Sequence, residues 1–132
     1  MRSIVVTFVT ALLLAGCSPQ SAQFFSAGSS EYDGAWVGRF QVSVRTEECE
    51  VARGGLQARI SGGQIQGTAR FRGSRNLGFS GVVEEGGGLK GGVIKLPLDR
   101  SIEIQGKFTE KTAGGRWSNR ECHGTWDLRK IR

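Results

Sequence analysis

The sequence predicts one all-β domain, a single antiparallel up-and-down barrel of about eight short strands. Three observations lead to this prediction. Apolar and polar residues alternate with a period of two, glycine-rich or polar turns separate the alternating stretches, and no helical apolar period follows the N-terminal segment. The chain holds 21 glycines and 2 prolines without charge blocks or a strict repeat, which indicates neither disorder nor collagen. A two-sheet β-sandwich is the alternative.

The clearest alternation lies over residues 35–45, the first expected strand. Its inward face is expected to carry Trp36, Gly38, Phe40, Val42 and Val44. The second and third strands, over 56–60 and 65–71, are separated by adjacent glycines at 62 and 63. Because such glycines supply the positive φ that a tight turn requires, we expect a hairpin there.

The remaining strands follow with connections of hairpin length. The fourth covers 77–83, and the fifth covers 88–96, where Gly91-Gly92 is compatible with a β-bulge that shifts the alternation. The sixth covers 102–108, a short seventh carries Trp117, and the eighth covers 122–129. Sequential strands are therefore expected to pair antiparallel.

A Gly-x-aromatic pattern recurs along the expected strands. It occurs at Gly38-Arg39-Phe40, Gly106-Lys107-Phe108, Gly115-Arg116-Trp117 and Gly124-Thr125-Trp126. A glycine on the same face as the ring lets the sheet bend and leaves room for a neighbouring aromatic side chain to cover the backbone. We interpret the pattern as structural rather than as a ligand site.

The N-terminal residues have the layout of an export signal. Arg2 supplies a positive charge, and the apolar run over 4–14 is shorter than the about 20 residues of a membrane-spanning helix. The residues Leu14-Ala15-Gly16-Cys17 then resemble the lipobox of bacterial lipoproteins. This resemblance implies cleavage before Cys17, diacylation of that cysteine (palmitate is the expected acyl group) and N-acylation of the new terminus.

The resemblance divides the chain into three parts. Residues 1–16 are the lipoprotein signal peptide, 17–33 the acylated cysteine and a flexible tether, and 34–132 the glycine-rich all-β domain. Ser18 follows the cysteine, and lipoproteins without an aspartate there are usually sorted to the outer membrane. We expect lipid anchoring at the periplasmic face of the outer membrane, with the inner membrane or the cell surface as alternatives.

With Cys17 assigned to lipid, Cys49 and Cys122 remain, and an even pair in an exported domain predicts a disulfide. In an up-and-down barrel the start of the last strand lies beside the end of the first strand. Cys122 starts the last expected strand, and Cys49 follows the end of the first. A bridge between them would therefore staple the seam at which the barrel closes.

The charge favours anionic partners, because 18 Lys+Arg stand against 12 Asp+Glu. An exported chain meets no nucleic acid, so an envelope protein, a glycan or an anionic lipid is the expected partner class. The loops opposite the tether carry the candidate binding residues Arg53, Arg72, Arg75, Arg100 and Arg120. The expected outer walls carry the surplus charge: Arg39, Arg45, Arg59, Arg70, Lys90, Lys95, Lys107, Arg116 and Arg129. We interpret these wall residues mainly as a solvated face.

The sequence offers no set of residues suited to catalysis. His123 is the only histidine, and Asp127 lies four residues along the same strand, about 13 Å away and too far for a dyad. No Cys-His pair or metal-ligand cluster is apparent. We expect no enzymatic activity, no cofactor, no metal and a monomeric chain.

Two short signatures frame the expected domain: Gly34-Ala35-Trp36 near its start and Cys122-His123-Gly124-Thr125-Trp126 near its end. With them, residues 34–129 resemble a class of small bacterial exported domains, and the resemblance implies no activity. The expected function is a non-catalytic envelope module that binds a protein, glycan or lipid. The alternatives are a carrier of small apolar ligands, which a deep apolar cavity above about 300 Å³ would favour, and a periplasmic protease inhibitor.

Overall fold

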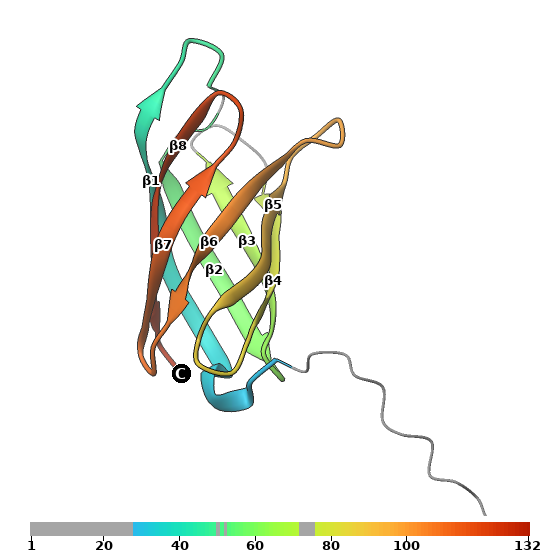
Figure 1. Ribbon diagram of the computed structural model, residues 1–132, viewed down its shortest axis with the longest axis vertical. Coiled ribbons are helices and arrows are strands. Elements are labelled where there is room, and N and C mark those ends of the chain that lie inside the picture. Colours follow the sequence, from blue (N-terminus) through green and yellow to red (C-terminus); the bar gives the residue numbers. More distant parts are fainter. Residues whose placement is uncertain (1–27, 50, 52, 72–75) are drawn as a thin grey trace, which may run out of the picture.

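The computed structural model describes residues 28–49, 51, 53–71 and 76–132. Eight strands form a closed antiparallel barrel in which each strand pairs with its neighbours in sequence and β1 pairs with β8 (Figure 1). The strands are β1 Gly34–Arg45, β2 Gly54–Ser61, β3 Gln64–Phe71, β4 Asn76–Val83, β5 Leu89–Lys95, β6 Ser101–Phe108, β7 Thr112–Ser118 and β8 Cys122–Lys130. The predicted up-and-down barrel is confirmed, and the sandwich alternative is wrong.

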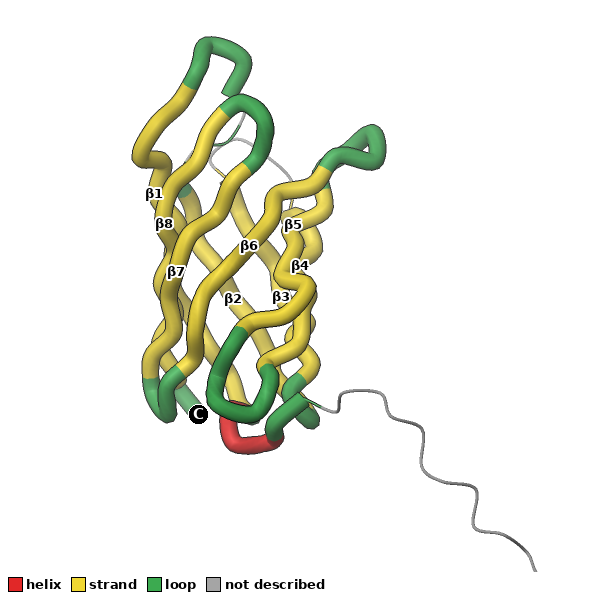
Figure 2. Tube along the Cα trace, in the orientation of Figure 1, coloured by secondary structure: helices red, strands yellow, loops and turns green. Residues whose placement is uncertain are grey.

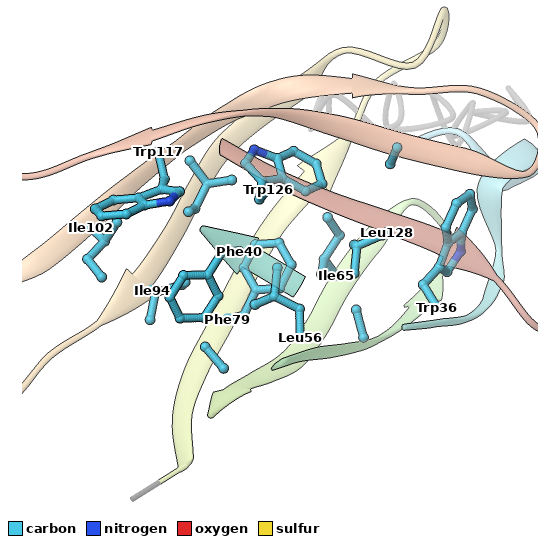
Figure 3. Close-up of a cluster of buried hydrophobic side chains, with 14 of the residues drawn as sticks. Trp36, Phe40, Leu56, Ile65, Phe79, Ile94, Ile102, Trp117, Trp126 and Leu128 are labelled. Carbon is cyan, nitrogen blue, oxygen red and sulfur yellow. The ribbon is translucent and has the colours of Figure 1, made fainter. Parts of the chain in front are cut away.

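Inward side chains from all eight strands fill the barrel interior (Figure 3). The largest fully buried ones are Trp36, Trp117, Phe40, Phe79 and Phe108. Several rings meet edge to face; the centroids of Phe40 and Phe71 lie 4.5 Å apart, and those of Trp36 and Phe108 lie 5.1 Å apart. An eight-stranded barrel is just wide enough for such side chains, so the interior is a packed core.

Two indole rings lie over glycines of other strands: Trp117 lies over Gly124 of the adjacent strand, and Trp126 lies over Gly106 two strands away. A methyl group added at Gly124 would lie 2.8 Å from the indole nitrogen of Trp117, and one added at Gly106 would lie 2.6 Å from Cζ2 of Trp126. The Trp126 indole nitrogen also donates a 2.9 Å hydrogen bond to the main-chain oxygen of Gln105. These contacts support the structural interpretation of the Gly-x-aromatic pattern.

A bulge changes the alternation near the end of β1. The pairing of β1 with β8 shifts between Val42 and Val44, so that Val44 pairs with His123. Val44 is 54% exposed, and the prediction that it faces the interior is wrong because the extra residue at Ser43 turns the next side chain outward.

A second bulge lies where the sequence suggests one, in β5. The pairing of β4 with β5 shifts between Ser80 and Val82, opposite Gly91, whose φ is 62°. A glycine in the left-handed region adopts this conformation without steric cost. The bulge brings Ile94 back onto the inward face, where it is 1% exposed.

A disulfide joins Cys49 to Cys122, whose Cα atoms lie 5.7 Å apart. Cys122 is also the strand partner of Arg45 at the end of the β1–β8 ladder, and Thr46 donates a main-chain hydrogen bond to Glu121. The predicted bridge is confirmed. It fastens the closing seam at one end of the barrel.

The opposite end, which we call the proximal end, holds the start of β1 and the C-terminus (Figure 2). It also holds the connections at 62–63, 84–88 and 109–111, as the strand order predicts. The other end is the distal end, and the described residues of its connections include 46–49, 96–100 and 119–121. In the ranges that the structure describes, no helix is long and apolar enough to cross a membrane.

A 3₁₀ turn, η1 (Ser30–Tyr32), covers the proximal end (Figure 2). Tyr32 is 5% exposed, its main-chain oxygen accepts a 2.9 Å hydrogen bond from the Trp36 indole, and burial raises the pKa of its phenol. The Asp33 carboxylate accepts hydrogen bonds from the main-chain N–H groups of Gly62 and Gly63, at 2.9 and 3.1 Å. The ordered unit therefore includes residues 28–33, which were expected to belong to the tether.

Candidate binding surface at the distal end

The structure places three of the five candidate arginines at the distal end, in two separate recesses. Arg100 and Arg120 line one recess, and Arg53 lines the other. Arg72 and Arg75 lie outside the described residues, as does the expected lipid-attachment residue Cys17. The five residues therefore do not form one site within the described part of the chain.

The first recess, which we call the distal recess, has a volume of about 460 Å³ and lies between three connections. Its lining residues are Glu48, Val51, Leu96, Asp99, Arg100, Ser101, Asn119, Arg120 and Glu121. Two guanidinium groups thus face three carboxylates. The lining of the distal recess therefore carries both signs of charge.

Local hydrogen bonds shape the distal recess. The Asn119 side chain accepts hydrogen bonds from the main-chain N–H groups of Glu121 and Cys122, at 3.0 and 2.8 Å, and so forms the β7–β8 turn. On the other side, the Arg100 Nε donates to the main-chain oxygen of Pro97 at 3.4 Å. Val51 is 1% exposed and belongs to the core, so its side chain separates the recess from the packed interior.

The β5–β6 connection beside the distal recess has an unusual backbone. Leu98 and Asp99 have φ values of 62° and 55°, in the left-handed region that most side chains avoid. Leu98 is also 88% exposed. A non-glycine residue in this conformation costs roughly 1–2 kcal/mol.

The second recess, which we call the arginine groove, has a volume of about 710 Å³ and lies at the distal end, along β1 and the start of β2. It is lined by Arg39, Phe40, Gln41, Val42, Arg45, Arg53, Gly54 and Gly55. None of these lining residues carries a carboxylate. Arg39 reaches Asp127 at 3.5 Å, but both side chains are more than half exposed, so this ion pair is weak.

The arginine groove exists because β1 is longer than β2. Pairing of β1 with β2 stops at Phe40 and Gly54, whereas pairing of β1 with β8 continues to Arg45. Arg53 and Val51 lie outside any strand, and Val51 turns into the core. The chain before β2 therefore leaves the distal part of β1, and a recess remains between the two.

Arg39 and Arg45 were interpreted from the sequence as part of the solvated wall, and their role in the groove was missed. The available signals are their positions at the middle and at the end of a 12-residue strand, and the Gly54-Gly55 pair. Neither signal reveals where β1 and β2 separate, because this depends on the path of the connection between them.

The described residues show no catalytic constellation. His123 is exposed and pairs with Val44 and Ser118 on the neighbouring strands. Within the described ranges, no group of three or more His, Cys, Asp or Glu side chains is placed to hold a metal ion. No protein family matches the chain, and no curated protein or solved structure matches it.

Proposed function

We propose that the protein is a lipid-anchored, non-catalytic binding module of the bacterial cell envelope, held through Cys17, that presents its distal end to a partner. One observation carries the proposal. The chain enters the barrel at the proximal end, whereas Arg53, Arg100 and Arg120 lie at the distal end. An anchor upstream of Gly28 therefore leaves the arginine-bearing surfaces accessible.

Chain length and acylation are consistent with this arrangement. Ten residues separate Cys17 from Gly28, and ten extended residues span at most about 35 Å. Two or more acyl chains hold a protein stably on a membrane, whereas one holds it only marginally. With Ser18 after the cysteine, the proposed location is the periplasmic face of the outer membrane.

Features of the barrel favour binding at the surface over carriage in the interior. Trp36, Phe40, Phe79, Phe108 and Trp117 occupy the space that a carried ligand would need. Arginine is enriched in the buried parts of protein interfaces because its guanidinium group makes several hydrogen bonds at once. The alternatives predict other results: a carrier copurifies with an apolar ligand, and an inhibitor blocks a periplasmic protease.

The anchor is tested by labelling cells with radioactive palmitate and fractionating their membranes. The wild-type protein is expected to incorporate label and to sediment with the outer membrane, and Cys17→Ala is expected to lose both properties. Equal labelling or equal sedimentation of Cys17→Ala would contradict the anchor.

The binding role is tested by photo-crosslinking in the cell envelope. A photo-crosslinking amino acid replaces Arg120 at the distal end or, as a matched control, Lys111 at the proximal end; both positions are exposed. We expect covalent adducts from position 120 and none from position 111. Adducts from position 111 alone, or from neither position, would overturn the proposed presentation of the distal end.

A further inference from the structure

We propose that the arginine groove binds an extended acidic segment of a partner protein, which adds as a strand beside residues 41–45 of β1. The inference rests on the proposed function, since it names the partner class of the binding module. Four features of the groove and of the strand beside it carry the inference: a one-sided strand, a set of arginines, an open floor and one exposed apolar side chain.

The first feature is the one-sided strand. Beyond Phe40, β1 has β8 on one side, and among the described residues no strand pairs with it on the other side. Main-chain N–H and C=O groups on such an edge are a template for another extended chain. Strand addition of this kind is a common way for proteins to bind peptides.

The second feature is the charge of the arginine groove. Arg39, Arg45 and Arg53 line it, and Arg70 lies two strands away from Arg39 in the same row, across Gly55. Arginine binds carboxylates through two parallel hydrogen bonds, which are about twice as strong as neutral ones. An acidic segment beside residues 41–45 would therefore find several arginines within reach.

The third feature is the open floor. Gly55 is the strand partner of both Arg39 and Arg70, and a methyl group added at Gly55 would meet nothing within 4 Å. Since neighbouring strands lie about 4.8 Å apart, the two arginine Cα atoms are roughly 10 Å apart. Space for a carboxylate thus remains between two guanidinium-bearing side chains.

The fourth feature is Val44, which the bulge turns outward to 54% exposure. An anionic glycan or a lipid headgroup would engage the arginines, but neither has the repeating main chain that pairs along residues 41–45 or the alternating side chains that would cover Val44. An extended polypeptide would contact the arginines, Val44 and the main chain of residues 41–45. The acidic protein segment is therefore the occupant that the groove fits best.

Binding is measured by fluorescence anisotropy with the full lipidated protein in a neutral detergent. The probe is a fluorescein-labelled seven-residue peptide in which glutamate alternates with valine. A second peptide has glutamine in place of glutamate, and a third carries N-methyl groups at alternate main-chain nitrogens. We expect the glutamate peptide to bind and the other two to bind at least about tenfold more weakly.

The protein variants locate the site. Arg45→Glu/Arg53→Glu is expected to weaken peptide binding at least about tenfold, because each substitution replaces attraction by repulsion. The matched control, Arg116→Glu/Arg129→Glu, makes the same change of charge on the outer wall of β7 and β8 and is expected to leave binding within about threefold. Near-ultraviolet circular dichroism verifies that both variants are folded.

Several results would overturn the inference. Equal binding of the glutamine peptide would show that the charge of the peptide does not drive binding. Equal binding of the N-methylated peptide would show that the peptide does not add as a strand. Binding only to vesicles that contain phosphatidylglycerol, or only to an anionic polysaccharide, would assign the groove to a different partner class. Palmitate labelling and crosslinking from position 120 test the proposed function independently of the groove. A protein that passes both tests but does not bind the peptide would overturn this inference alone.

Discussion

Trp117 on β7 donates a 2.9 Å hydrogen bond from its indole nitrogen to the main-chain oxygen of Gln41 on β1, although β8 lies between the two strands. The bond crosses β8 at Gly124, the strand partner of both Trp117 and Val42. The closing seam is therefore braced from inside the barrel by an indole ring and at its distal end by the disulfide.

Gly124→Ala is expected to destabilise the protein by about 2 kcal/mol or more, since the new methyl group collides with the Gln41 oxygen and with the indole. Urea unfolding followed by tryptophan fluorescence measures the loss. Gly78→Ala is the matched control, because a methyl group there meets nothing within 4 Å. Equal stability of the two variants would show that the indole does not need the space above Gly124.

Replacing both disulfide cysteines, as Cys49→Ser/Cys122→Ser, should lower stability by up to about 4 kcal/mol, because the bridge closes a long loop in the unfolded chain. Such a loss corresponds to a fall in Tm of roughly 15 °C or more. Hydrogen exchange at Thr46, whose amide bonds to Glu121 across the seam, should accelerate as well. An unchanged Tm would mean that the seam does not depend on the bridge.

Asp33→Ala is expected to cost about 1 kcal/mol, since two main-chain N–H groups of the β2–β3 turn lose a carboxylate acceptor. Asp127→Ala removes the exposed ion pair with Arg39 and should cost less than about 0.5 kcal/mol. Thermal unfolding ranks the two variants, and amide exchange at Gly62 and Gly63 should rise only in Asp33→Ala. A larger loss in Asp127→Ala would contradict this ranking.

The double substitution Leu98→Asn/Asp99→Gly should stabilise the barrel by about 1 kcal/mol. Both positions have positive φ. Hairpin turns with positive φ at both central residues prefer Asn followed by Gly. Leu98 is 88% exposed, so little packing is lost. A fall in Tm would show that the leucine makes a stabilising contact, and peptide binding in the arginine groove should not change.

Much of the fold could be predicted because its signals are local. A period of two places Phe40 and Trp126 on inward faces, and the glycines at 62 and 63 predict a hairpin wherever the rest of the chain lies. The closure followed from combining this strand order with Cys49 and Cys122. Each of these steps needs only the neighbouring residues and a general rule of topology.

The arginine groove and the docked N-terminal segment could not be predicted in this way. Asp33 binds a turn 29 residues further along the chain, and a short stretch of sequence does not reveal such a contact. No glycine marks the bulge at Ser43 in the sequence, so the alternation assigns Val44 to the wrong face. Arg39 and Arg45 gain their setting only from the unequal lengths of β1 and β2.

Strand β1 begins at the proximal end, where the chain enters the barrel, and runs to the distal groove. If a partner held at residues 41–45 were pulled away from the membrane, tension would run along the axis of this strand. Its hydrogen bonds to β2 and β8 lie perpendicular to that axis, so they would be loaded in shear and would resist together rather than open one after another. The barrel would then behave as a tensile link between lipid and partner, with β1 as its stiff element.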